Sequence, residues 1–133
     1  MNELAKTIDI YLDAWVEPDE DRRADLIRQA WKPDGRLVDP PLTGEGHARI
    51  SQMAAALQSN FPGHAFRRVS GIDEHHGQFR FAWELVAPDG TVAMAGLDVG
   101  EVAEDGRLVK IAGFIGPLPA LAGAPPKAGV DAI

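Results

Sequence analysis

The sequence predicts an α+β fold in which three N-terminal helices pack into a strongly bent antiparallel sheet. Two observations lead to this prediction. Across residues 2–60, apolar side chains recur at intervals of three and four, the period of an amphipathic helix. From Ala65 onward the period changes to two, and turn residues separate the apolar runs. Helices followed by a sheet define the α+β class, and a sheet bent around them would form a cone whose open end suits a ligand.

The three helices are expected at residues 2–16, at 19–31 with a cap at Asp19 or Asp21, and at 47–60. Pro18 ends the first, because proline lacks an N–H donor and restricts the residue before it. A short strand over 36–39 then stops at Pro40-Pro41, and residues 42–46 form a loop. The apolar residues expected on the buried helix faces are Leu4, Ile8, Tyr11, Trp15, Leu26, Ile27, Ala30, Trp31, Ile50, Met53, Ala54 and Leu57.

Four strands are expected to form an antiparallel meander, with the short strand near Asp39 as an extra edge. The first two cover residues 65–74 and 78–86, and the last two form a hairpin over 91–116. The Asp105-Gly106 pair between apolar runs is a strong hairpin signal. The other two turns are His75-His76-Gly77 and Pro88-Asp89-Gly90. Adjacent histidines on a strand point to opposite faces, so this pair predicts a turn and no metal site.

Composition limits the kind of protein this can be. The chain has 133 residues, 45% hydrophobic and 25% charged, as expected for one soluble globular domain. Its net charge of −7 argues against nucleic acid and anionic membranes as partners. It contains no cysteine, which excludes thiolate chemistry, and no motif points to a cofactor. Without a signal-peptide pattern or an apolar run of membrane-spanning length, a cytoplasmic location is expected.

The domain is expected to cover residues 1–116, and residues 117–133 form a tail rich in Pro, Gly and Ala. Such a tail is either disordered or lies over a groove. Its apolar residues slightly favour partial docking. They are Leu118, Leu121, Val130 and Ile133.

A lone carboxylate, Asp98, lies in the middle of an apolar strand. Both faces of this strand are mostly apolar, so a charge there is costly unless it is paired or the group stays protonated. Gly96 and Gly100 leave room on the same face, which suggests the wall of a cavity. The alternative is a structural ion pair between Asp98 and an arginine, Arg80 or Arg68.

Two further residues are candidates for chemistry. Tyr11 is the only tyrosine and lies on the apolar face of the first helix, while Asp39 ends a short strand before Pro40. In a water-poor cavity, one ionised carboxylate can act as a base, and a neutral carboxyl with a tyrosine can stabilise an oxyanion. Proton abstraction next to a carbonyl requires this combination. The alternatives are a core tyrosine whose hydroxyl binds backbone or water, and an aspartate that only forms a turn.

The chain resembles the nuclear transport factor 2-like (NTF2-like) superfamily, which includes ketosteroid isomerases and SnoaL-like cyclases. The resemblance covers about residues 4–116. Tyr11-Leu12-Asp13-Ala14-Trp15 is similar to the helix with the isomerases' oxyanion-hole tyrosine, and Val38-Asp39-Pro40 to their base-bearing segment. Leu97-Asp98 is similar to the strand with their protonated acid. The resemblance implies Asp39 as base, with Tyr11 and Asp98 as hydrogen-bond donors, as in the ketosteroid isomerase mechanism.

From this resemblance we expect an apolar pocket for a small hydrophobic molecule, and a homodimer formed through the outer sheet face. The function expected is that of an isomerase or cyclase. Two alternatives stay open: a non-catalytic ligand-binding or dimerisation domain, and a hydrolase or hydratase with a water activated by Asp98. The residues expected to line the pocket are Trp15, Met53, Leu57, Trp83, Met94 and Phe114.

Overall fold

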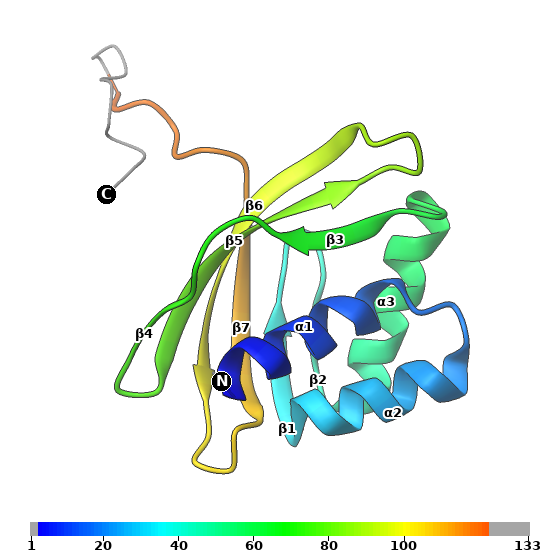
Figure 1. The fold of residues 1–133 in the computed structure, drawn as a ribbon, viewed down its shortest axis with the longest axis vertical. Helices are drawn as coiled ribbons and strands as arrows, with labels where there is room; N and C mark the ends of the chain where they lie inside the picture. The colour runs from blue at the N-terminus through cyan, green and yellow to red at the C-terminus, as the bar shows by residue number, and fades with distance from the viewer. Residues whose placement is uncertain (1–2, 123–133) are drawn as a thin grey trace.

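The computed structural model describes residues 3–122 and confirms the α+β class, with three helices beside a curved sheet of seven strands (Figure 1). The strand order is β2-β1-β7-β6-β5-β3, and β4 pairs with β5 beside β3. The elements are α1 (Glu3–Val16), α2 (Glu20–Ala30), β1 (Trp31–Val38), β2 (Thr43–Glu45), α3 (His47–Asn60), β3 (Ala65–Arg68), β4 (Asp73–His75), β5 (Gln78–Val86), β6 (Val92–Val102) and β7 (Leu108–Ile115).

The predicted antiparallel meander is confirmed for the strands after Ala65, but the whole sheet is mixed. β1 pairs in parallel with β7, with Val38 opposite Ala112. The second helix also ends one residue earlier than predicted, at Ala30, and Trp31 begins a strand of eight residues. Trp31 is fully buried, as expected, but it lies on the sheet. Because α2 leads directly into β1, the direction of β1 depends on how the helices pack against the sheet, which its local sequence does not encode.

Two other segments differ from the prediction. Thr43–Glu45, predicted as loop, pairs with β1 as the short strand β2. The predicted strand over 65–74 is interrupted between β3 and β4. At this break the chain stays beside β5, because the N–H of Val69 donates to the carbonyl of Ala82 and the N–H of Ala82 donates to Ser70 Oγ. A serine hydroxyl therefore replaces a backbone carbonyl in the ladder.

The core lies between the helices and the concave face of the sheet. The inward side chains of β5 (Phe79, Phe81, Trp83 and Leu85) are at most 5% exposed and belong to one hydrophobic core with the buried residues of α1 and α3. Among the described residues, no helix is long and apolar enough to cross a membrane.

After β7 the chain runs away from the body of the domain (Figure 1). Leu118 and Leu121 are 63% and 75% exposed, so this part of the tail does not dock on the domain. The predicted docking of Val130 and Ile133 lies outside the described residues.

Candidate active site

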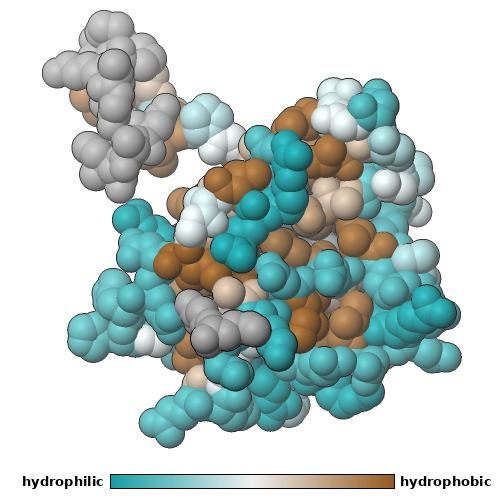
Figure 2. Space-filling model, viewed as in Figure 1, coloured by the Kyte–Doolittle hydropathy of each residue, from teal (hydrophilic) through white to brown (hydrophobic). Residues whose placement is uncertain are grey.

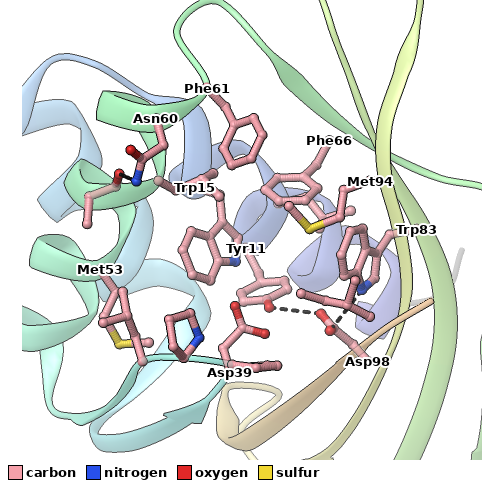
Figure 3. A pocket seen from close by; sticks show the side chains of 17 residues that line it. Tyr11, Trp15, Asp39, Met53, Asn60, Phe61, Phe66, Trp83, Met94 and Asp98 are labelled. Carbon is pink, nitrogen blue, oxygen red and sulfur yellow. Dashed lines mark hydrogen bonds between the residues drawn. The ribbon is translucent and has the colours of Figure 1, made fainter.

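A cavity of about 400 Å³ lies between α1, α3 and the concave face of the sheet. In Figure 2, apolar residues show in the interior between the sheet and the helices, and hydrophilic residues cover most of the helical side. Most of the cavity wall is apolar, and the acidic groups gather at one end (Figure 3). The lining residues are Tyr11, Leu12, Trp15, Asp39, Pro40, Pro41, Leu42, Met53, Ala56, Leu57, Asn60, Phe61, Phe66, Trp83, Met94, Asp98 and Ile115.

Asp98 is the most deeply buried acid described, with 3% of its surface exposed. It lies in the middle of β6, facing inward. The Tyr11 hydroxyl donates to its Oδ2 at 2.8 Å, and the Trp83 indole N–H donates to its Oδ1 at 3.0 Å (Figure 3). Both carboxylate oxygens therefore have a donor from a different element, α1 and β5. This satisfies the polar atoms that burial removes from water.

The two glycines beside Asp98 make room for aromatic rings. A Cβ on Gly96 would lie less than 3.0 Å from the Trp83 ring, and a Cβ on Gly100 equally close to the Phe79 ring. Gly96 is opposite Trp83 in the β5–β6 register, so its missing side chain leaves room for the indole, whose N–H reaches Asp98. The space beside Asp98 that the glycines predicted exists, but these rings fill it.

Asp39 reaches the same end of the cavity from another part of the chain. It follows the last residue of β1, and the parallel pairing of Val38 with Ala112 brings it beside Gly113. A Cβ on Gly113 would lie less than 3.0 Å from Asp39 Oδ1 and 3.0 Å from Asp98 Oδ1. The two carboxylates therefore face the same space. Asp39 also forms a turn, because its N–H donates to the carbonyl of Leu42.

Burial changes the acid–base behaviour of all three groups. It raises the pKa of Asp39 to about 6. It raises the pKa of Asp98 to about 7, an effect that the hydrogen bonds from Tyr11 and Trp83 oppose and the nearby charge of Asp39 reinforces. Burial and the Asp98 charge raise the pKa of Tyr11 well above its usual value, although a hydrogen bond from Trp15 lowers it. Both acids therefore titrate near neutral pH, while the tyrosine keeps its proton.

The structure thus brings together the three residues predicted for chemistry: Tyr11, Asp39 and Asp98. Neither arginine proposed as a structural partner of Asp98 is bound to it. Arg80 Nε lies 2.8 Å from Asp73 Oδ2, and Arg68 Nε lies 3.6 Å from Asp9 Oδ1.

Five of the six residues predicted to line the pocket do so: Trp15, Met53, Leu57, Trp83 and Met94. Phe114 does not. It points outward from the sheet and is 57% exposed, and its neighbour Ile115 lines the cavity instead, because side chains alternate along a strand. The prediction chose the wrong face at the end of β7.

Sequence reasoning missed several wall residues and one role. Phe61, Phe66, Asn60 and the Pro40-Pro41 segment also line the cavity. Trp83 was predicted only as wall, yet it is a hydrogen-bond donor to Asp98. The signal for this role was present as a glycine in β6 that leaves space for a tryptophan on β5. This signal can be interpreted only when the register that puts Gly96 opposite Trp83 is known.

No protein-family model and no curated protein matches this chain. Solved structures do match it, and together they define its class as the NTF2-like α+β fold. One is an NTF2-like protein of unknown function from Exiguobacterium sp., with 20% identity, a TM-score of 0.65, and coverage of 83% of this chain and 98% of that chain. Another is a "putative SnoaL-like polyketide cyclase" from Jannaschia sp., with 15% identity, a TM-score of 0.67 and coverage of 85% of each chain.

A third solved structure is more similar in sequence. It is a "putative isomerase of the SnoaL-like family" from Agrobacterium tumefaciens, 37% identical, with a TM-score of 0.80 and coverage of 87% of this chain and 99% of that chain. At this identity and coverage the resemblance seen in the sequence is confirmed. The chain belongs to the SnoaL-like family and has the NTF2-like α+β fold.

Proposed function

We propose that this domain binds a small, largely apolar carbonyl compound and removes a proton from the carbon next to the carbonyl, as an isomerase or cyclase does. The main support is that two carboxyl groups from distant parts of the chain face one space beside Gly113, at the end of an apolar cavity. The names of SnoaL-like relatives, an isomerase and a polyketide cyclase, agree with this class of reaction.

Asp39 is the proposed base. No side chain among the described residues donates a hydrogen bond to its carboxylate, so its lone pairs remain available to a substrate. With a pKa of about 6 it is mostly ionised at neutral pH and still basic enough to accept a proton. It takes the proton from carbon, and the electrons of that C–H bond form an enolate. In an isomerisation, the same group returns the proton to another carbon.

Asp98 and Tyr11 are proposed to stabilise the enolate oxygen. An indole N–H can only donate, so Trp83 keeps Asp98 Oδ1 as an acceptor, and a proton on Asp98 belongs on Oδ2. Oδ2 is the oxygen that faces the Tyr11 hydroxyl. When Asp98 is neutral it donates to the tyrosine oxygen, and the tyrosine O–H is released toward the cavity. A neutral Asp98 therefore frees a donor for the oxyanion.

The test is hydrogen–deuterium exchange by NMR with a panel of cyclic and steroid-like ketones in deuterated water. We expect exchange at the carbon next to the carbonyl, and a loss of about 100-fold or more in Asp39→Asn, because the base is gone. Asp73→Asn is the matched control, since Asp73 is exposed on β4 and pairs with Arg80. Equal exchange in Asp39→Asn and the native protein, with both folded by circular dichroism, would contradict the proposal.

The same samples examine the two alternatives. Hydration or hydrolysis would place solvent oxygen in the product, which mass spectrometry in ¹⁸O water detects. Each Asp98 oxygen accepts one hydrogen bond, so a water activated by this group would have to use the lone pairs that remain. Ligand binding without exchange for any ketone would favour a non-catalytic binding domain.

We also propose that the protein forms a homodimer through the outer face of the sheet. Leu97 and Phe114 are directly opposite each other on β6 and β7, and with Val99 they form an outer apolar patch with exposed fractions of 37%, 57% and 38%. Apolar residues clustered on an exposed sheet face are typical of an interface. Charged residues flank the outer apolar patch, including the Arg67–Glu84 ion pair, as at the rim of an interface.

Light scattering coupled to size-exclusion chromatography measures this directly. We expect a dimer for the native protein and a monomer for Phe114→Glu, since a charge in the centre of the patch would be buried without a partner. Leu121→Glu is the control, because Leu121 is 75% exposed and lies outside the sheet. A native monomer at micromolar concentration would contradict the dimer.

A further inference from the structure

We infer that the cavity binds protonated hydrophobic amines in preference to neutral molecules of the same shape, and that it rejects carboxylates. This inference rests on the ligand-binding part of the proposed function and is independent of catalysis. It concerns the charge of the ligand that the site selects.

The charges around the cavity have one sign. Among the described residues that line it, the titratable groups are Tyr11 from α1, Asp39 after β1 and Asp98 from β6. The lining residues of α3, β3 and β5 carry no charge, and within residues 3–122 no lysine, arginine or histidine lines the cavity. Arg68 and Arg23 are not among the described residues that line the cavity: Arg68 Nε lies 3.6 Å from Asp9 Oδ1, and Arg23 donates to Ser51 Oγ and the carbonyl of Glu17.

Two carboxylates that share a buried space without a cation are unfavourable when both are ionised. Asp39 and Asp98 are in this situation, because both lie within 3.0 Å of the point where a Cβ on Gly113 would be. A proton relieves the repulsion, and so does a bound cation. An ammonium group has three donors, and Asp39 has no side-chain donor among the described residues. The geometry therefore suits an ammonium group at this end of the cavity.

The remaining walls suit the apolar part of such a ligand. Phe66 packs edge-to-face on Trp83 at 5.3 Å and against Trp15 at 6.0 Å, which gives a continuous aromatic wall. Aromatic faces attract cations as well as apolar groups, because their quadrupole is negative above the ring. A cavity of about 400 Å³ accommodates a compact cage or a small ring system.

The affinity of an amine should depend on pH in a defined direction. Burial raises the pKa of Asp39 to about 6 and that of Asp98 to about 7, so both lose their protons between about pH 5 and pH 8. An alkylamine stays protonated over this range, with a pKa of about 10. Its affinity should therefore rise with pH, that of a carboxylate should fall, and that of a neutral alcohol should change least.

Three probes of one shape test the inference: 1-adamantylamine, 1-adamantanol and adamantane-1-carboxylate. Isothermal titration calorimetry gives the affinities, and quenching of Trp15 and Trp83 reports binding inside the cavity. At pH 8 we expect the amine to bind about tenfold tighter than the alcohol, and the carboxylate to bind most weakly. An alcohol that binds as tightly as the amine, a carboxylate that competes with it, or no saturable binding of the amine would overturn the inference.

Asp39→Asn should reduce the preference for amine over adamantanol, and the pH dependence that remains should be that of Asp98 alone. Asp73→Asn, on the exposed side of the sheet, should change neither. If Asp39→Asn keeps the native preference for amine over alcohol, the charge argument is wrong. The outcome is separable from the catalytic proposal, since ketone exchange can be absent while the amine preference holds, and the reverse.

Discussion

Strands β5 and β6 lie side by side in the sheet and distribute polarity in opposite ways. β5 is an ordinary amphipathic strand. Its inward Phe81 and Trp83 are buried, and its outward Glu84 binds Arg67 near solvent. Near its centre, β6 has the opposite distribution, with a polar residue inward and apolar residues outward. Its inward Asp98 is 3% exposed, and its outward Leu97 and Val99 are 37% and 38% exposed.

The comparison teaches that β6 is not organised by core formation alone. Burial of apolar side chains stabilises a sheet, and burial of a carboxyl group opposes this unless donors satisfy it. In β6 the donors are Tyr11 and the neighbouring strand's Trp83. An inward acid and outward apolar residues both reduce stability or solubility in an isolated domain. The proposed ligand on the inner face and the proposed second subunit on the outer face would account for these two features.

The largest expected effect concerns the pH dependence of stability. The pKa of Asp98 is raised from 3.8 to about 7 in the folded state, so between these values the folded protein holds a proton that the unfolded chain has lost. The free energy of unfolding should therefore decrease as pH rises from about 4 to about 7, by about 4 kcal/mol from this group. Asp39 acts in the same direction. Urea unfolding followed by tryptophan fluorescence at pH 5, 6, 7 and 8 measures this decrease.

Asp98→Asn identifies the group responsible. The amide cannot ionise, so most of the decrease should disappear in this variant while any contribution of Asp39 stays. Two results would show that burial of Asp98 does not reduce stability at higher pH. One is a free energy of unfolding of the native protein that is constant between pH 5 and pH 8, and the other is a pH dependence that is unchanged in Asp98→Asn.

A smaller effect is expected where β7 passes the two acids. Gly113→Ala places a methyl group against Asp39 and Asp98, and the carboxyl groups have to move apart. We expect a loss of about 1–3 kcal/mol in the free energy of unfolding, together with slower ketone exchange. The greater separation should also lower the pKa of Asp98, measured by carbon-13 NMR, because the nearby charge of Asp39 contributes to raising it.

The control is Gly71→Ala, because a Cβ on Gly71 would meet no atom within 4 Å. It should leave both the pKa values and the exchange close to native. If Gly113→Ala is as stable and active as Gly71→Ala, the two carboxyl groups do not depend on the space beside Gly113.

The smallest effect is expected on the outer face of β5. Arg67 Nε and Nη2 donate to Glu84 Oε1 at 3.0 and 2.6 Å, and the Arg67 side chain is 58% exposed. Exposed ion pairs contribute less than about 1 kcal/mol. A double-mutant cycle with Arg67→Gln and Glu84→Gln should give a coupling energy below this limit. A coupling energy above about 2 kcal/mol would mean that the outer face of β5 is not an ordinary solvated face.

Local pattern was enough to predict much of the fold. The 3.6-residue period of α1 and α3, the alternation in β5 and the Asp105-Gly106 turn between β6 and β7 depend on residues near one another in the chain. Asp98 could be singled out for the same reason, since a carboxylate interrupts an apolar strand. The segment similarities around Tyr11 and Asp39 added the other two groups of the site.

Tertiary structure alone decided how these groups meet. The parallel pairing of β1 with β7 places Asp39 beside Gly113, and the register of β5 on β6 places Trp83 over Gly96, where its N–H reaches Asp98. It also turned Phe114 outward and Ile115 into the cavity. Such pairings join residues far apart in the chain, and their register is set by the packing of whole elements. The sequence by itself determined the helices and strands and the polar residues on their apolar faces. The packing of these elements determined which of those polar residues became neighbours.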